Sequence, residues 1–155
     1  MTGNRVLVMH GVNLDQLGRR PPEHYPQMTL AELEVAVGRC APELGLAISF
    51  DQTNHEGEFC ETLHEAAETA DGLLLNPGAW THYAYAIRDA VEFVIQQGLK
   101  VVEVHLSDID GREEFRRHSV LEGIVSHRIK GQGPDGYRHA IEWLTATAPA
   151  ATTVG

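Results

Sequence analysis

Five short apolar segments alternate with helical patterns along the chain, and this alternation constrains the fold more than any other feature of the sequence. The predicted strands span residues 5–10, 47–52, 72–76, 100–106 and 123–129. The predicted helices span residues 29–44, 57–70, 82–97 and 135–147, and a polar stretch at 107–121 contains one short helical turn. Strands that are separated by helices form a parallel sheet with helices on both faces.

The length of 155 residues is that of one ordinary domain. Right-handed crossover connections leave few topologies for five such strands. We therefore predict a single α/β domain over residues 1–148, a flavodoxin-like three-layer sandwich whose five-stranded parallel sheet has the order 2-1-3-4-5. Residues 149–155 are predicted to be a disordered tail.

Composition excludes several classes of partner. The net charge is −10 and no basic stripe is visible, which argues against a nucleic-acid surface because phosphate contacts need clustered cations. No apolar run approaches the roughly 18 residues of a membrane span, and we expect no membrane partner. The N-terminus lacks the long apolar segment of a signal peptide. Cys40 and Cys60 are therefore expected to be reduced thiols of a cytoplasmic protein.

Polar side chains follow each predicted strand at the sheet edge where ligands of such folds bind. A long loop, GVNLDQLGRRPPEHY (residues 11–25, here called the lid), follows the first strand, and TNHEGE follows the second. The candidates at this edge are Asn13, Arg19, Arg20, Tyr25, Asn76, His82, Glu103, His105, Ser107, Arg112 and Arg116. We expect these groups to converge on one site.

Each candidate also has a purely structural interpretation. The sequence NPG at residues 76–78 suits a turn, and His105 suits a histidine of the core. The charge run at 112–117 suits a solvated helical face. His82 and Asp89, seven residues apart, are predicted to share one helix face, either at the surface or against a ligand or a neighbouring subunit. Their common position at one sheet edge favours a site.

Several motifs can be set aside. GQGPDG (131–136) fits a dinucleotide fingerprint, but no strand follows it to supply the acid that binds ribose. The lid lacks a glycine-rich phosphate cradle, and Asn76 stands where a phosphorylated aspartate would be needed. The nine histidines form no HExxH pattern and no zinc spacing. We therefore predict no metal site.

Five segments carry a resemblance to a known family, in order and over nearly the whole chain. They are GVNLDQLGRR with Tyr25, QTNHEGEFCETLHEA, LLLNPGAWTHYAYAIRDA, VVEVHLSDIDGREEFRRHS and GPDGY. On these segments the chain resembles the type II 3-dehydroquinate dehydratases. The resemblance implies a hydro-lyase without cofactor that converts 3-dehydroquinate to 3-dehydroshikimate by anti elimination through an enolate. It also implies a homododecamer built of trimers, and a role in the shikimate pathway or in quinate breakdown.

The resemblance assigns catalytic roles to five residues. Tyr25 would be the proton acceptor, carried by a mobile lid that closes over substrate. A free phenol ionises near pH ~10, and Arg20 would favour its charged form and stabilise the transition state. Asn13, with an ordered water, would stabilise the enolate. His105 would be the proton donor, oriented by Glu103 two positions earlier on the same strand.

The resemblance also assigns the substrate contacts. Asn76, His82 and Arg116 match the positions that bind hydroxyls and carboxylate, with Arg116 preferred to Arg112. The backbone at Leu106 and Ser107 would receive the carboxylate. Asp89 would reach the site of a neighbouring subunit.

The chain departs from the family pattern at particular positions, namely Val12, Pro21 or Pro22, Pro26, Asp108, Lys130 and Gln132. These departures leave two other interpretations open. One is a diverged paralogue that binds a cyclic polyol acid with little or altered catalysis. The other is an enzyme of related enolate chemistry on another cyclic polyol acid.

Overall fold

The computed structural model describes residues 1–146, and over this range the sheet is parallel with the strand order β2-β1-β3-β4-β5. The predicted fold class and strand order are confirmed. The strands are β1 (Arg5–His10), β2 (Ala47–Gln52), β3 (Gly72–Asn76), β4 (Lys100–His105) and β5 (His127–Lys130). The predicted tail at 149–155 lies outside the described residues.

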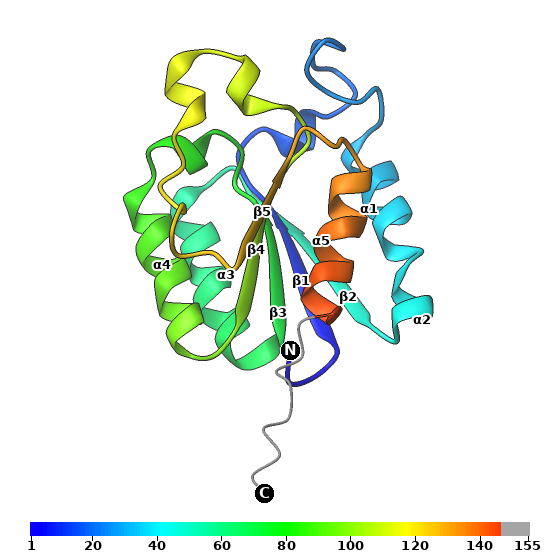
Figure 1. Cartoon of the computed structure of the whole chain (residues 1–155), viewed down its shortest axis with the longest axis vertical. Coiled ribbons are helices and arrows are strands. Elements are labelled where there is room, and N and C mark those ends of the chain that lie inside the picture. Colours follow the sequence, from blue (N-terminus) through cyan, green and yellow to red (C-terminus); the bar gives the residue numbers. More distant parts are fainter. Residues whose placement is uncertain (147–155) are drawn as a thin grey trace, which may run out of the picture.

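Helices cover both faces of the sheet (Figure 1). One face is covered by α1 (Leu30–Gly38), α2 (Ala41–Leu44) and α5 (Asp135–Ala146), and the other by α3 (Glu56–Thr69) and α4 (Tyr85–Gln96). Each face has its own buried core, one around Phe59 and Leu63 and one around Leu33 and Tyr137. Strand β3 is buried along its whole length, as expected of a central strand with helices on both sides.

The predicted helix at 29–44 is two helices. It begins as expected, with Thr29 and Glu32 forming a reciprocal capping box. It ends at Gly38, and Pro42 stands in the first turn of α2. Proline lacks the backbone N–H that a continuous helix would need at this position, so the chain restarts the helix instead.

The helix predicted from His82 begins later, at Tyr85. The N–H groups of Tyr83 and Ala84 both donate to the carbonyl of Trp80, which closes a separate 3-10 helix, η2 (Gly78–His82). The prediction that His82 and Asp89 share one helix face is therefore wrong. His82 is held at the sheet edge, while Asp89 is exposed on α4.

The last strand lies later than predicted, at His127–Lys130 rather than 123–129. Ile124 and Val125 donate backbone hydrogen bonds to Leu121 in turns and pack against the α3–α4 core. Their apolar character therefore reflects the packing of a loop against this core rather than a strand. The polar stretch at 107–121 contains two 3-10 helices instead of one, η3 (Ile109–Gly111) and η4 (Glu114–Arg117).

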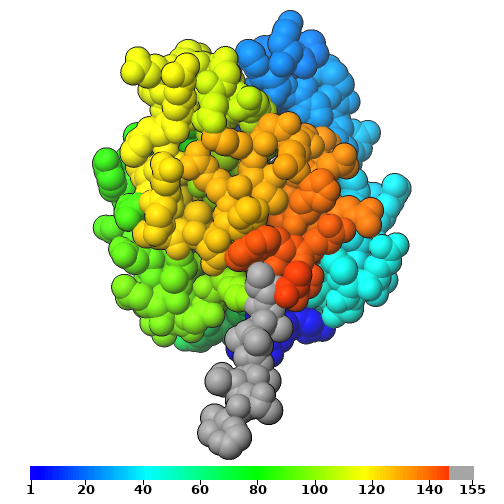
Figure 2. Space-filling view, in the orientation of Figure 1, coloured from blue at the N-terminus to red at the C-terminus, as the bar shows by residue number. Residues whose placement is uncertain are grey.

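Two segments stand above the carboxyl ends of the strands, the lid and residues 107–121 (Figures 1 and 2). The lid contains the 3-10 helix η1 (Leu14–Gln16). Strand register places His10 beside Asn76, so the ends of β1 and β3 lie together beneath them. Within residues 1–146, the helices are too short or too polar to cross a lipid bilayer.

Candidate active site

The floor of the site is a close approach between the chain leaving β1 and the chain leaving β3. The N–H of Gly11 donates a 2.8 Å hydrogen bond to the carbonyl of Asn76. A Cβ atom on Gly11 would lie 2.3 Å from the carbonyl oxygen of Pro77. Gly78 has a φ of +63°, and its own Cβ would lie 2.7 Å from the carbonyl oxygen of Val12. Glycine at both positions therefore lets the two loops meet.

Asn13 is held at the start of the lid in a left-handed conformation, with a φ of 66°. Asparagine adopts this conformation more readily than most residues. The backbone N–H of Asn13 donates a 2.8 Å hydrogen bond to Oδ1 of Asn54, and Nδ2 of Asn54 donates to Asp15. The segment after β2 thus fixes the position of Asn13.

Tyr25 lies between two guanidinium groups. The Cζ atom of Arg20 lies 3.9 Å from the centroid of the Tyr25 ring, over its face. Nη1 of Arg112 donates a 3.0 Å hydrogen bond to the Tyr25 hydroxyl oxygen. A cation that donates to a phenol oxygen favours the phenolate. Arg20 contacts the ring, and Arg112 contacts the oxygen that would carry the charge.

His105 and Glu103 form a buried acid–base pair at the end of β4. Nε2 of His105 donates a 2.6 Å hydrogen bond to Oε1 of Glu103, and the Glu103 side chain is fully buried. Burial acts to raise the pKa of Glu103, but the contacts with His105, Thr81 and Arg128 together outweigh it, and the pKa lies below its ordinary value. Glu103 is therefore a carboxylate, and it fixes the His105 tautomer.

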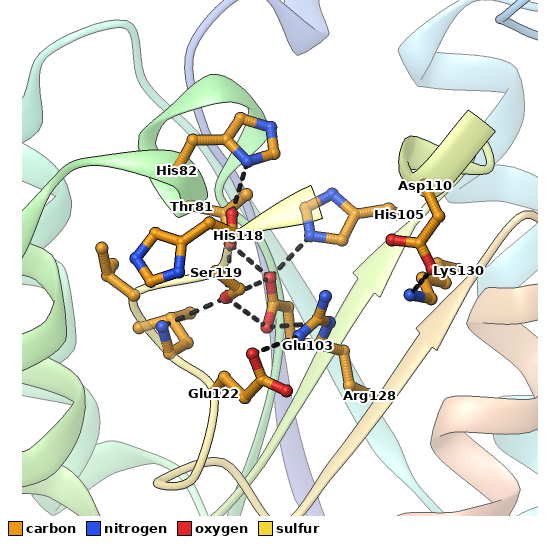
Figure 3. Close-up of polar contacts among 12 residues, drawn as sticks. Thr81, His82, Glu103, His105, Asp110, His118, Ser119, Glu122, Arg128 and Lys130 are labelled. Atoms are coloured by element: carbon orange, nitrogen blue, oxygen red, sulfur yellow. Dashed lines mark hydrogen bonds and ion pairs between the residues drawn. The ribbon is translucent and has the colours of Figure 1, made fainter. Parts of the chain in front are cut away.

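The same carboxylate is held by two hydroxyl groups (Figure 3). Thr81 donates to Oε1 of Glu103, and Ser119 lies 3.1 Å from both carboxylate oxygens. Thr81 comes from η2 and Ser119 from the segment after η4. A buried carboxylate needs such donors because its hydration is lost.

Asn76 and His82 are both oriented by buried partners. Nδ2 of Asn76 donates a 2.8 Å hydrogen bond to the Tyr137 hydroxyl, and its Oδ1 accepts from the N–H of Gly78. Nδ1 of His82 donates to the carbonyl of His118 over 2.8 Å. Burial lowers the pKa of His82, which leaves a neutral ring at neutral pH.

Arg116 is in an ion pair with Glu113, with 2.7 Å between Nε and Oε2. The carbonyls of Leu106 and Ser107 accept hydrogen bonds from Gly133 and Gly131, which fixes the course of this backbone segment.

Asp108, at a position that departs from the family pattern, is exposed and caps η3 by accepting from the N–H of Asp110. Its carboxylate is thus engaged outside the pocket that His105 lines.

One pocket gathers most of the predicted residues. Those that line it are Asn13, Arg20, Tyr25, Asn76, His82, His105, Leu106, Ser107 and Arg116. Glu103 lies beneath the pocket in contact with His105, and Asp89 lies away from the pocket on α4. Arg112 also lines the pocket, although the family resemblance assigns the substrate contact to Arg116.

Two residues of the site carried only weak signals in the sequence. Arg112 follows the fourth strand, as a site residue should, but it lies in a charge run that a solvated face explains equally well. Tyr137 belongs to the GPDGY segment, yet nothing in the sequence linked it to Asn76. Among residues 1–146, no cluster of three or more His, Cys, Asp or Glu side chains is arranged to hold a metal ion.

Comparison with known proteins identifies the family of the chain. The family model described as dehydroquinase class II matches residues 4–145. A 3-dehydroquinate dehydratase of Pelotomaculum thermopropionicum is 46% identical over 144 residues, which cover 93% of this chain and 98% of that protein. The 3-dehydroquinate dehydratase of Bacillus subtilis is 44% identical over 138 residues, 89% of this chain and 91% of that protein.

Solved structures of the same family share the fold. The crystal structure of a type II dehydroquinase from Butyrivibrio crossotus superposes with a TM-score of 0.88 at 38% identity, covering 93% of this chain and 99% of that one. A type II dehydroquinase from Propionibacterium acnes gives a TM-score of 0.87 at 39% identity, covering 93% and 97%. The chain therefore belongs to the class II dehydroquinase family.

Proposed function

We propose that this protein is a 3-dehydroquinate dehydratase, a hydro-lyase that removes water from 3-dehydroquinate to give 3-dehydroshikimate. One observation carries the proposal. A tyrosine whose oxygen accepts a hydrogen bond from a guanidinium and a histidine paired with a buried carboxylate line the same pocket. Elimination beside a ketone needs one base and one acid on different elements, and this pocket holds both.

The first step is proton removal by Tyr25. The phenolate oxygen takes the proton from the carbon beside the ketone, and the electron pair of the broken C–H bond moves to the ketone oxygen to give an enolate. Arg112 stabilises the phenolate through its hydrogen bond, and Arg20 covers the ring. Closure of the lid over the substrate excludes water and strengthens both interactions.

The enolate oxygen needs a fixed donor. Asn13 lies at the base of the lid with its backbone tied to Asn54, so its side chain can hold a water molecule against the enolate without moving. A preorganised donor of this kind stabilises the developing charge.

The second step is loss of the hydroxyl on the opposite face of the ring, an anti elimination. The enolate electrons form the new C=C bond as the C–O bond breaks, and His105 gives the leaving hydroxyl its proton, so that water departs. Nε2 of His105 is bound to Glu103, which leaves Nδ1 as the nitrogen that faces the substrate. Transfer of the proton of Tyr25 back to His105 through solvent restores the enzyme.

Substrate binding uses the polar groups that remain. Arg116 exchanges Glu113, its present partner, for the substrate carboxylate, which the backbone at Leu106 and Ser107 also receives. Asn76 and His82, already oriented by their partners, bind the substrate hydroxyls.

We further propose that the site is completed by a second copy of the chain. Asp89 is exposed on α4 and lies away from the pocket of its own chain, so it is free to reach a neighbour's pocket in a trimer. Four such trimers would form a dodecamer. The free thiols of Cys40 and Cys60 agree with a cytoplasmic enzyme.

The test is to mix the purified protein with 3-dehydroquinate near neutral pH and to follow the absorbance of the conjugated enone product. We expect turnover by the wild type and loss of most activity in His105→Ala. Tight binding of 3-dehydroquinate without product would instead identify a binding paralogue. Turnover of a different cyclic polyol acid in preference to 3-dehydroquinate would identify related enolate chemistry.

A further inference from the structure

Strand β5 places two cations beside the acid–base pair of β4. In the parallel register Arg128 lies opposite Glu103 and Lys130 lies opposite His105, so all four side chains belong to one face of the sheet. Nε of Arg128 is 3.7 Å from Oε2 of Glu103, and the Arg128 side chain is only 16% exposed. Figure 3 shows the Glu103 carboxylate in contact with both His105 and Arg128.

The two oxygens of Glu103 have different charged partners. Oε1 accepts the hydrogen bond of His105 at 2.6 Å, and Oε2 faces Arg128. The hydroxyl of Ser119 bridges both oxygens. One buried carboxylate charge is thus shared between an imidazole that must release a proton and a guanidinium that cannot lose one.

We propose that Arg128 is a positioning residue that acts on His105 through Glu103, limiting how strongly the carboxylate stabilises the imidazolium whose Nδ1 gives its proton to the leaving hydroxyl. This inference rests on the proposed function, in which His105 is the proton donor. Arg128 does not line the pocket, so its effect reaches the substrate through the other two residues.

The physical reason is the low polarity around Glu103. A buried carboxylate that faces an imidazolium alone forms a tight ion pair, and a histidine held in such a pair is a poor acid. A second cation at the other oxygen reduces the attraction that the carboxylate exerts on the imidazolium, so that Nδ1 releases its proton more readily. The nearby charge of Arg128 also contributes to the lowered pKa of Glu103, which keeps this group ionised.

The other charged groups near Glu103 and His105 have partners or positions that limit their effect on His105. Lys130 is paired with Asp110 of η3, so its charge is largely offset. His82 faces the pair from η2 and is neutral at neutral pH. Arg112 and Arg116 line the pocket on the substrate side. Arg128 is the cation in contact with the carboxylate itself, and its second acidic neighbour, Glu122, is 70% exposed and 3.9 Å away.

The test compares the titration of the His105 ring in full-length variants labelled with ¹³C-histidine, with the signal assigned by its loss in His105→Asn. In Arg128→Met the Glu103 carboxylate has no second cation beside it and stabilises the charged His105 ring more strongly. We therefore expect the titration midpoint of His105 to rise by at least about half a pH unit. Arg128→Lys keeps the cation and should titrate near the wild type.

Two further variants test whether the effect is specific to Arg128. Arg138→Met removes a cation from an exposed pair with Glu142 on α5 and should leave the midpoint unchanged, which controls for net charge. Glu122→Gln, at an exposed position where folding is not at risk, frees Arg128 to act on Glu103 and should lower the midpoint. Equal midpoints in the wild type, Arg128→Met and Glu122→Gln would overturn the inference.

Steady-state kinetics with 3-dehydroquinate then link the titration to turnover. In Arg128→Met we expect the high-pH limb of kcat to move in the same direction as the midpoint, with KM within about two-fold of the wild type, because Arg128 does not touch substrate. A shifted midpoint with an unmoved kcat limb would support the electrostatic link and contradict the role of His105 in the proposed function. The two failures are therefore distinguishable.

Discussion

Nη1 of Arg112 donates a 3.0 Å hydrogen bond to the hydroxyl oxygen of Tyr25, across 87 residues of sequence. This bond joins the lid to the segment after β4, above the edge of the sheet. The phenol of the proposed base therefore has a cation at its oxygen in addition to Arg20 at its ring face. In the proposed mechanism, the reactivity of Tyr25 depends on two segments rather than on the lid alone.

Replacing Tyr25 by Phe removes the proposed base while keeping the ring beneath Arg20. We expect kcat to fall by about a thousand-fold, in the range typical of a lost general base. Binding of 3-dehydroquinate, measured by calorimetry, should change by less than about three-fold, because the ring remains. Undiminished turnover in this variant would remove Tyr25 from the mechanism.

Replacing Arg112 by Met removes the hydrogen bond to the Tyr25 oxygen. A hydrogen bond to a charged group contributes about 1.5–3 kcal/mol, so we expect kcat/KM to fall by about ten- to a hundred-fold. Arg117→Met is the matched control, since Arg117 is exposed and donates to the carbonyl of Asp110. Similar kinetics in the two variants would show that Arg112 has no part in activating Tyr25.

Replacing Tyr137 by Phe frees the Asn76 amide from its 2.8 Å hydrogen bond. The Tyr137 ring is fully buried, and the substitution keeps its packing. We expect KM to rise by about three- to ten-fold, in line with about 1 kcal/mol for one hydrogen bond, with a smaller change in kcat. Tyr85→Phe, at an exposed position, should match the wild type. An unchanged KM in Tyr137→Phe would mean that Asn76 is oriented by Gly78 alone.

His10 makes stability depend on pH. Burial lowers its pKa from 6.5 to about 4. As the pH falls from 6.5 to about 4, His10 therefore becomes protonated in the unfolded chain before it does in the folded chain. The stability that the neutral ring contributes is present above pH 6.5 and is lost between about 6.5 and 4, to a total of about 3 kcal/mol.

The measurement is denaturant unfolding at pH 7 and pH 4 at one protein concentration. His10→Leu should lose about 3 kcal/mol less than the wild type over this interval, since leucine does not titrate. The exposed His24 provides the control variant His24→Gln, which should follow the wild type. Identical losses in the wild type and His10→Leu would refute the assignment to His10.

The proposed role of Asp89 in a neighbour's pocket can be tested by complementation. Asp89→Ala and Tyr25→Phe subunits, each with little activity alone, should regain activity when they are dissociated and reassembled together. A site is intact when its own chain has Tyr25 and the neighbour has Asp89, so a 1:1 mixture should reach about a quarter of the wild-type activity. Tyr25→Phe mixed with His105→Ala should stay inactive, because both residues belong to the same chain. Failure of the first mixture would place Asp89 outside the site.

The sequence by itself determined the sheet and the edge at which the site lies. Apolar segments of strand length that alternate with helices specify a parallel sheet, and parallel strands bring all their carboxyl ends to one edge. Tyr25, His105 and Asn76 could therefore be selected because each lies at or beyond the carboxyl end of a strand. The pattern failed at Ile124 and Val125, which are apolar because their loop packs against the core and not because they belong to a strand.

Tertiary structure alone decided which side chains meet. Arg112 and Arg116 are four residues apart in one charge run, and only the path of the segment after β4 assigns Arg112 to Tyr25 and Arg116 to Glu113. Tyr137 and Arg128 reach Asn76 and Glu103 from the last helix and the edge strand. Local patterns record the period of an element and the burial of its face, whereas contacts between distant segments depend on how the loops fold over the sheet, and no local pattern encodes that.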